Sequence, residues 1–240
     1  MQYSTFAAID IGSYDVILEI FEISKKQGIR SVDKICHRME LGKDTYTLGK
    51  IRPEMEEELC RVLADFVRIM EGYRVDDYRA TASSAISEAS NSLYVLGKIH
   101  QLTGLSVTVL SNSEQRFLSY KALAAMEDNF NNIIEKGTAI LDLDGGSFQI
   151  SLFDKDALVT TQNIRMGSLR IRERLAGIQS ETEHYEEMVE ELIWNEVSSF
   201  KKMYLKDRKI ENIMLIGDVF TDSVYQNIEE KTKKIISREN

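Results

Sequence analysis

The sequence predicts an α/β fold built from two similar lobes. The main observation is a repeated order of elements. A strand, a turn that carries an acid and glycine, and a returning strand occur near the N-terminus and again about 130 residues later. Helical patterns follow each of these hairpins, as in domains that pack helices on a sheet. The two turns are Asp10-Ile11-Gly12-Ser13 and Asp142-Leu143-Asp144-Gly145-Gly146-Ser147. We expect an N-terminal lobe over residues 1–126 and a shortened second lobe over 127–240.

The first half is predicted to open with an antiparallel meander of three strands, with Gln27 and Gly28 as typical turn residues between the second and third. Pro53, the single proline, precedes acidic residues and apolar residues at helical spacing, and Gly72 follows them. This pattern predicts a helix. The expected elements are strands at 6–12, 16–23, 29–41, 78–82 and 105–110, and helices at 54–70, 92–102 and 113–127.

The second half begins again with a strand and a glycine turn. An acidic run from Glu181 to Glu191 is interleaved with apolar residues at helical spacing, which indicates an amphipathic helix with a solvated face. The expected elements are strands at 138–143, 148–153 and 212–216, and helices at 169–175, 182–206 and from Asp222 onward.

Composition argues against nucleic-acid and membrane partners. The chain has 240 residues and a formal net charge of −9, so a polyanionic ligand would need a local site of opposite character. Cys36 and Cys60 are too far apart for a CxxC motif, and two thiols are no disulfide framework. The N-terminus lacks a signal-peptide pattern, and no apolar run approaches the roughly 20 residues of a membrane span. We expect a cytoplasmic protein, with a homodimer as a possible assembly.

The two turns carry groups that suit phosphate and a metal. Glycines let successive backbone N–H groups converge on an anion, and a serine adds a hydroxyl donor. An aspartate at a strand end can hold Mg²⁺. A simple hairpin turn needs the same glycines, so one copy alone leaves both interpretations open. The second copy and a third strand-glycine turn, Ile216-Gly217-Asp218, favour phosphate loops.

These residues resemble the Ppx/GppA family of exopolyphosphatases and guanosine pentaphosphate phosphatases. Six segments carry the resemblance in family order: residues 10–13 (DIGS-type), Leu41-Gly42 with Gly49 (LG…G), 79–82 with 88–91 (ATSALREASN-type), 109–111 with Glu114 (ISGxEEARL-type), 142–147 (DIGGGS-type) and 166–171 (LGxxRL-type).

The resemblance implies a two-lobed, ribonuclease H-like fold of the actin-like ATPase type, with duplicated mixed sheets flanked by helices. It also implies release of terminal phosphate from inorganic polyphosphate or guanosine pentaphosphate by water, with Mg²⁺ and a glutamate base. Such chemistry needs positioning, a metal and cationic neutralisation. By the same resemblance, Asp10 and Asp142 are expected to bind Mg²⁺. The residues expected to bind phosphate are Gly12, Ser13, Gly145, Gly146, Ser147 and Arg170.

The chain departs from the family pattern at positions where a charged side chain is expected to take part in catalysis or phosphate binding. The glutamate expected to be the base falls on Gln115, while Glu114 keeps the preceding one, and the phosphate-binding arginine falls on Ser87. Asp144 replaces a glycine of the second loop, and Gln149 replaces its glutamate. An amide is no proton acceptor.

Two hypotheses follow. In the first, Glu114 serves as base, Arg116 or Arg170 replaces the missing cation, and Asp15 and Asp144 hold extra Mg²⁺. In the second, the protein is a catalytically inactive family member that senses phosphate or nucleotide or binds another protein. The family core usually continues beyond the third turn, so the second lobe is expected to be small or the sequence a fragment.

Overall fold

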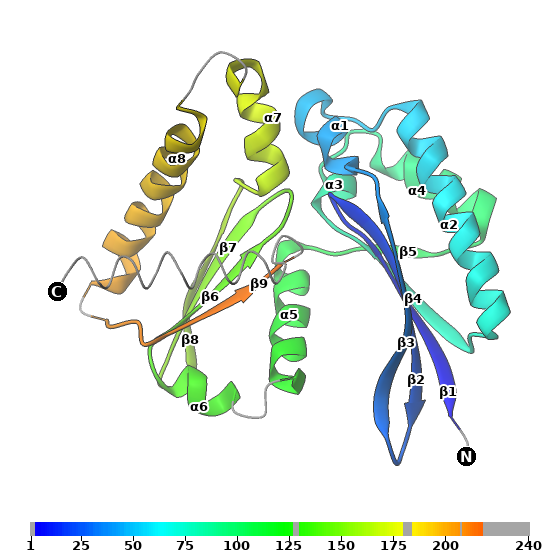
Figure 1. The fold of residues 1–240 in the computed structure, drawn as a ribbon, viewed down its shortest axis with the longest axis horizontal. Coiled ribbons are helices and arrows are strands. Elements are labelled where there is room, and N and C mark those ends of the chain that lie inside the picture. Colours follow the sequence, from blue (N-terminus) through cyan, green and yellow to red (C-terminus); the bar gives the residue numbers. More distant parts are fainter. Residues whose placement is uncertain (1–2, 127–129, 180–183, 207, 218–240) are drawn as a thin grey trace. The chain divides into compact units, whose positions relative to one another are not determined.

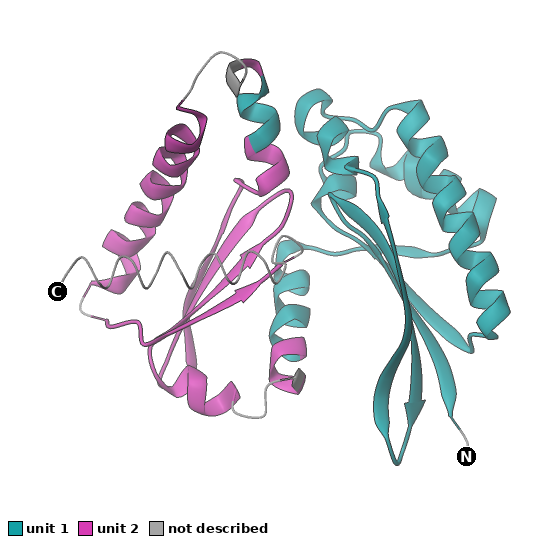
Figure 2. Cartoon of the chain, in the orientation of Figure 1, with its two compact units in different colours: residues 1–121, 172–176 teal, residues 122–171, 177–240 magenta. Residues whose placement is uncertain are grey.

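The computed structural model describes residues 3–126, 130–179, 184–206 and 208–217, and the chain divides into two compact units. Unit 1 comprises residues 1–121 and 172–176, and unit 2 comprises residues 122–171 and 177–240 (Figure 1, Figure 2). Each unit has one mixed sheet with helices against it. The predicted α/β architecture with duplicated sheets is therefore confirmed.

The sheet of unit 1 has five strands in the order β3-β2-β1-β4-β5. β1 lies at the centre, antiparallel to β2 and parallel to β4. Because side chains alternate across a strand, Ala7, Ile9 and Ile11 all enter the core. The strands are β1 (Ser4–Ile11), β2 (Asp15–Ser24), β3 (Gly28–Arg38), β4 (Asp77–Ala82) and β5 (Val107–Val109).

Helices α2 and α4 lie side by side against the unit 1 sheet (Figure 1). α2 begins at Pro53, where a missing backbone N–H costs nothing, and ends at Arg74 in the left-handed conformation with φ of 53°. Leu59, Leu63 and Phe66 form its buried stripe. The helices are α1 (Leu41–Leu48), α2 (Pro53–Tyr73), α3 (Ser84–Ser87), α4 (Ser92–Thr103) and α5 (Asn112–Met126).

Unit 2 repeats this strand pattern. Its sheet has the order β8-β7-β6-β9, and β6 is antiparallel to β7 and parallel to β9. Val197 and Phe200 of α8 pack with Ile150 and Leu152 of the sheet. The elements are α6 (Phe130–Glu135), β6 (Thr138–Leu143), β7 (Phe148–Asp154), β8 (Ala157–Ile164), α7 (Ser168–Gln179), α8 (Tyr185–Phe200), the π-helical turn η1 (Lys201–Leu205) and β9 (Asn212–Ile216).

The differences from the predicted elements have local causes. The third strand ends at Arg38 rather than at Leu41, because Glu40 has a φ of 51° and turns the chain into α1. Four short elements, α1, α3, α6 and β8, were not predicted. The predicted helix from Asp222 and the third turn beyond Gly217 lie outside the described residues.

The units divide after Lys121, five residues before the predicted lobe boundary, and residues 172–176 of α7 cluster with unit 1. The division falls inside α5, a continuous helix. No helix in the described part of the chain is long and apolar enough to span a bilayer.

Candidate functional site

The turn between β1 and β2, residues 12–15, is held closed by its own backbone; we call it loop 1. The Gly12 N–H donates to the Asp15 carbonyl at 3.0 Å. A Cβ on Gly12 would lie 2.9 Å from that carbonyl oxygen, closer than real side chains approach a backbone oxygen. A side chain at position 12 would therefore displace the Asp15 carbonyl in the present shape of loop 1.

Loop 2, residues 144–147 between β6 and β7, repeats this geometry. The Asp144 N–H donates to the Ser147 carbonyl at 3.0 Å, the counterpart of the bond that closes loop 1. Each loop has four residues between the last paired residues of its strands. Asp144 therefore occupies the position of Gly12, and Ser147 that of Asp15. The repeat seen in the sequence extends to individual hydrogen bonds.

Asp10 and Asp142 hold equivalent positions at the ends of the two central strands. Asp10 lies next to Thr81 of the parallel neighbour, and Asp142 lies between Gln149 and Ile216. Asp10 is exposed, and its Oδ1 accepts the Thr81 hydroxyl at a long 3.4 Å. Each unit thus presents a carboxylate two residues before its loop.

The residues of loop 1 fit the Mg²⁺ that the resemblance implies. The Oδ1 atom of Asp15 is buried and has no hydrogen-bond partner, and a bound cation would satisfy it. The Asp10 Oδ2 atom borders the same turn, 3.8 Å from where a Gly12 Cβ would lie. Among the described residues, no three His, Cys, Asp or Glu side chains converge. Mg²⁺ commonly takes only one or two protein carboxylates, with water and substrate phosphates as its other ligands.

Loop 1 is fastened to two helices through a triangle of hydroxyl groups. The Ser13 Oγ lies 2.7 Å from the Tyr46 hydroxyl and 3.3 Å from the Ser84 Oγ, and the last two are 2.8 Å apart. Ser13 is only 5% exposed. Since protein groups already engage its hydroxyl, Ser13 shapes the loop, and α1 and α3 set where the loop lies.

Loop 2 is fastened by the start of α7. Backbone N–H groups in the first turn of α7 donate to the Gly145 carbonyl at 3.0 and 3.1 Å, and the Arg170 Nε donates to the Gly146 carbonyl at 2.9 Å. A Cβ on Gly167 would collide with the backbone of loop 2. Arg170 and Gly167, both in the LGxxRL-type segment, therefore hold the shape of the predicted phosphate loop.

Glu114 lies in the first turn of α5, where it forms a capping box with Ser111. Its Oε2 accepts the Ser111 backbone N–H at 2.9 Å and the Ser111 hydroxyl at 2.7 Å, and the Glu114 N–H donates back to that hydroxyl at 3.3 Å. These hydrogen bonds, together with the positive charge of Arg79, lower the pKa of Glu114. A carboxylate with a lowered pKa is a weaker base.

Neutral side chains stand at three positions where the resemblance leads us to expect charge. Ser87 is exposed at the end of α3, and Gln115 is half-buried beside Glu114. Gln149 is buried in β7, directly across from Asp142. A buried carboxylate at 149 would repel Asp142, whereas the amide does not.

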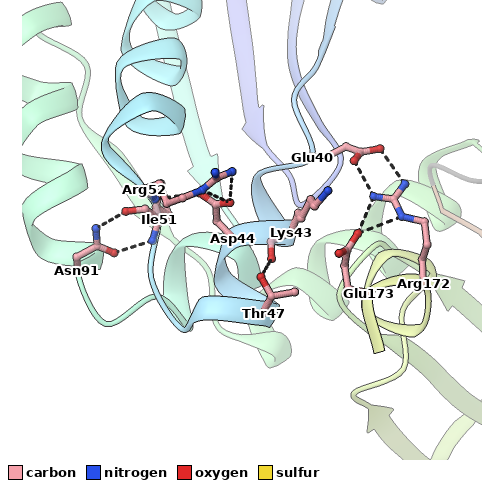
Figure 3. A network of polar contacts seen from close by, with 9 residues as sticks. All are labelled: Glu40, Lys43, Asp44, Thr47, Ile51, Arg52, Asn91, Arg172 and Glu173. Atoms are coloured by element: carbon pink, nitrogen blue, oxygen red, sulfur yellow. Dashed lines mark hydrogen bonds and ion pairs between the residues drawn. The ribbon is translucent and has the colours of Figure 1, made fainter. Parts of the chain in front are cut away.

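A polar network around Arg172 was not predicted. Its guanidinium donates two hydrogen bonds to the Glu40 carboxylate, at 2.9 and 2.6 Å, and one to the Glu173 carboxylate at 3.0 Å (Figure 3). It also donates to the hydroxyl of Tyr14 in loop 1 at 3.0 Å. The hydrogen bond from Arg172 lowers the pKa of Glu40. No local sequence signal links residues so far apart in the chain.

Two further contacts show what the family-like segments do in unit 1 (Figure 3). The Asn91 side chain accepts the Ile51 N–H at 3.0 Å and donates to the Ile51 carbonyl at 2.8 Å. Asp44, which is 1% exposed, accepts the Arg52 backbone N–H and the Arg52 Nε, each at 2.9 Å. These residues connect α1, α2 and α4. In this part of the chain, the residues that resemble the family therefore stabilise the fold of unit 1 and do not take part in the reaction.

The predicted residues are divided between the two units. Unit 1 holds Asp10, Gly12 and Ser13 at loop 1 and Glu114 and Gln115 at the start of α5; unit 2 holds Asp142, Gly145, Gly146, Ser147 and Arg170 around loop 2.

Comparisons with known proteins identify related chains. The sequence profile of the Ppx/GppA phosphatase family matches residues 19–240. A bifunctional 3-dehydroquinate synthase/phosphatase of Fusobacterium nucleatum is 22% identical over 238 residues, which are 94% of this chain and 34% of that protein. Exopolyphosphatase 1 of Mycobacterium leprae is 25% identical over 144 residues, 60% of this chain and 41% of that protein.

A solved structure agrees with the fold. The crystal structure of the Aquifex aeolicus member of the Ppx/GppA protein family has a TM-score of 0.66 at 22% identity, and the match covers 89% of this chain and 66% of that chain. The two-lobed, actin-like ATPase fold expected from the sequence is confirmed. The chain spans well under half the length of both curated relatives.

Proposed function

The chain belongs to the Ppx/GppA phosphatase family, and from this membership we propose that it is a slow phosphohydrolase. It releases the terminal phosphate of inorganic polyphosphate or guanosine pentaphosphate. The observation that carries the proposal is the matched pair of loops, each closed by the same hydrogen bond and each preceded by an aspartate. Relatives named as exopolyphosphatases support the choice of substrate.

In this proposal each loop binds phosphate oxygens of the substrate. Gly12 and Ser13 supply the loop 1 backbone, and Gly145, Gly146 and Ser147 supply loop 2, with Arg170 as the adjacent cation. Asp10 in unit 1 and Asp142 in unit 2 are each proposed as a ligand for Mg²⁺, which would neutralise phosphate charge when bound. Phosphoryl transfer of this kind depends on positioning and on charge neutralisation rather than on covalent catalysis.

Glu114 is the proposed general base. A water oxygen attacks the terminal phosphorus, a proton passes from that water to the Glu114 carboxylate, and the phosphoanhydride P–O bond breaks toward the shortened chain. The capping box makes Glu114 a weak base, and Ser87 leaves a family cation absent, so we expect a low rate.

Phosphate release from long-chain polyphosphate in the presence of Mg²⁺ tests this role. Glu114→Gln keeps the size of the side chain and an acceptor for Ser111, so the protein should fold while its rate falls at least about 100-fold, the usual contribution of a general base. Ser111→Ala removes the hydroxyl hydrogen bond to Glu114 but keeps the one from the backbone N–H, so it should raise the rate modestly. A Glu114→Gln rate equal to that of the wild type would remove Glu114 from the mechanism.

A second candidate function is binding without turnover, because the Glu114 carboxylate is already committed to Ser111. In that case the wild type would bind polyphosphate or guanosine pentaphosphate saturably in calorimetry and release no phosphate. The double variant Ser87→Arg/Gln115→Glu restores the arginine and the glutamate that the family pattern has at these two positions. If it gains activity over a silent wild type, the second candidate is favoured.

A further inference from the structure

A cavity of about 750 Å³ lies in unit 2, where α8 runs into η1 and the segment before β9. Small-molecule sites commonly measure roughly 300–1,000 Å³. Leu205 and Ile210 line the cavity and also pack against the hydrophobic core of the unit, which fixes its floor. A ligand the size of a nucleotide fits this volume.

The cavity is strongly cationic in a chain whose formal net charge is −9. Its described lining contains no carboxylate and five cationic residues, namely Lys201, Lys202, Lys206, Arg208 and Lys209. Of these five, Arg208 alone lies within ion-pair distance of a described acid, with its Nε 3.7 Å from Asp154. One further acid in this segment, Asp207, lies outside the described residues. The positive potential of this lining favours an anionic ligand.

An aromatic side chain borders the same cavity. Trp194 is the single tryptophan of the chain and is 65% exposed. It precedes Lys201 by seven residues, or two helical turns, so both lie on one face of the helical segment, while Phe200 packs into the core. A planar π-surface next to several ammonium groups can bind an aromatic ring that carries negative charge nearby.

The backbone at the cavity is irregular. η1 is a π-helical turn, and Lys206, which ends it, has a φ of 34°, in the region that favours glycine. Such turns and strained residues occur most often at functional sites. Lysines near a helix C-terminus also offset the helix dipole. That effect accounts for Lys201 and Lys202 but not for the cavity, for Trp194 or for the strain.

We propose that this cavity binds a nucleoside polyphosphate, with its base stacked on Trp194 and its phosphates held by Lys201, Lys202 and Lys209. Every base has a face that stacks on an aromatic side chain, and lysine ammonium groups bind phosphate as point charges. The site uses none of the residues of loops 1 and 2. Binding here is therefore independent of the hydrolysis proposed above.

Fluorescence of Trp194 tests the proposal directly, because no other tryptophan contributes. Titration with ATP should quench the emission saturably. Tripolyphosphate, which has the charge but no base, should bind about tenfold more weakly and leave the emission nearly unchanged, since stacking of one base commonly contributes a factor of this size or more.

Charge variants locate the site. Lys201→Glu/Lys202→Glu should raise the Kd for ATP at least about tenfold, because charged hydrogen bonds to phosphate are replaced by repulsion. The matched control is Lys25→Glu/Lys26→Glu at a second cavity in unit 1, where Glu22 and Asp76 also line the wall. That control should leave the ATP titration unchanged. Circular dichroism checks folding, and Lys209→Ala is the milder variant if the double reversal unfolds.

Three results would overturn the proposal. They are an emission that ATP does not quench, an equal response to tripolyphosphate, and an ATP affinity that the folded Lys201→Glu/Lys202→Glu or Lys209→Ala variants leave unchanged. A loss of polyphosphate hydrolysis in the experiment described above would leave this binding in place, so the two proposals fail separately.

Discussion

Individual side chains show how polar groups in this protein are committed to holding loops. Glu114 closes a helix cap, the Ser13 hydroxyl closes a triangle, and Arg172 connects Tyr14 to Glu40. Each of these residues lies in or beside a segment that resembles a phosphatase motif. A residue that matches a catalytic motif can therefore stabilise the local structure instead of taking part in the reaction.

Acid should weaken the ion pair between Glu40 and Arg172. Arg172 holds the pKa of Glu40 below its ordinary value of 4.5, so the pair contributes stability above that value and loses it as the pH falls through the folded-state pKa. We expect Glu40→Gln to lower the free energy of unfolding by about 1 kcal/mol at pH 7 and by much less near pH 3. Denaturant unfolding at both pH values measures this.

Glu71→Gln provides the control, because Glu71 is an exposed acid of α2. It should change stability little at either pH. If Glu40→Gln costs the same at pH 3 as at pH 7, the ion pair is not the source of the effect.

At the scale of elements, the start of α7 and loop 2 form one rigid piece. Gly167 touches the loop backbone so closely that any side chain would push the two apart. Arg170 and the N–H groups of the first turn then hold the loop carbonyls. The shape of loop 2 is thus set by the helix that follows β8.

Gly167→Ala should therefore destabilise unit 2 by more than about 2 kcal/mol and weaken any phosphate binding at loop 2. Gly177→Ala lies in the same helix, has open space around its Cβ position, and should stabilise by roughly 0.5–1 kcal/mol. Thermal unfolding of both variants measures the contrast. Equal effects of the two substitutions would contradict the proposed contact.

Local sequence patterns predicted every described strand except β8, together with both turns and their repetition. These features depend on hydrophobic period, glycine and acidic residues within a few positions of one another. The Ser111-x-x-Glu114 capping box was not predicted, although its spacing is a sequence signal. The partners of Ser13 and Arg172 were not predicted either, since Tyr46, Ser84 and Glu40 approach them only after folding. Roles that depend on burial, such as that of Gln149, have no signal in one sequence.

At the scale of the whole molecule, the described part of unit 1 has more buried apolar side chains than the described part of unit 2. The core of unit 1 is one large cluster that runs from β1 and β2 to α2 and α4. Among the described residues of unit 2, the cluster around Ile150, Leu152 and Phe200 is much smaller. Because buried apolar area dominates folding free energy, unit 2 should open more readily.

Native-state hydrogen exchange can measure this difference. We expect amides of β6 and β7 to exchange through openings of lower free energy than amides of β1 and β2, with a gap that narrows as denaturant rises. Identical opening free energies across the four strands would show instead that the chain unfolds as a single cooperative unit.

The matched loops differ in what fastens them, and this has an evolutionary consequence. Loop 1 depends on hydroxyl groups from α1 and α3, whereas loop 2 depends on Gly167 and Arg170. Mutations that alter one set of anchors leave the other intact, so the two halves of a duplicated gene can drift at different speeds. Asp144 stands where the other half has Gly12, and both loops keep the closing hydrogen bond despite this difference in side chain.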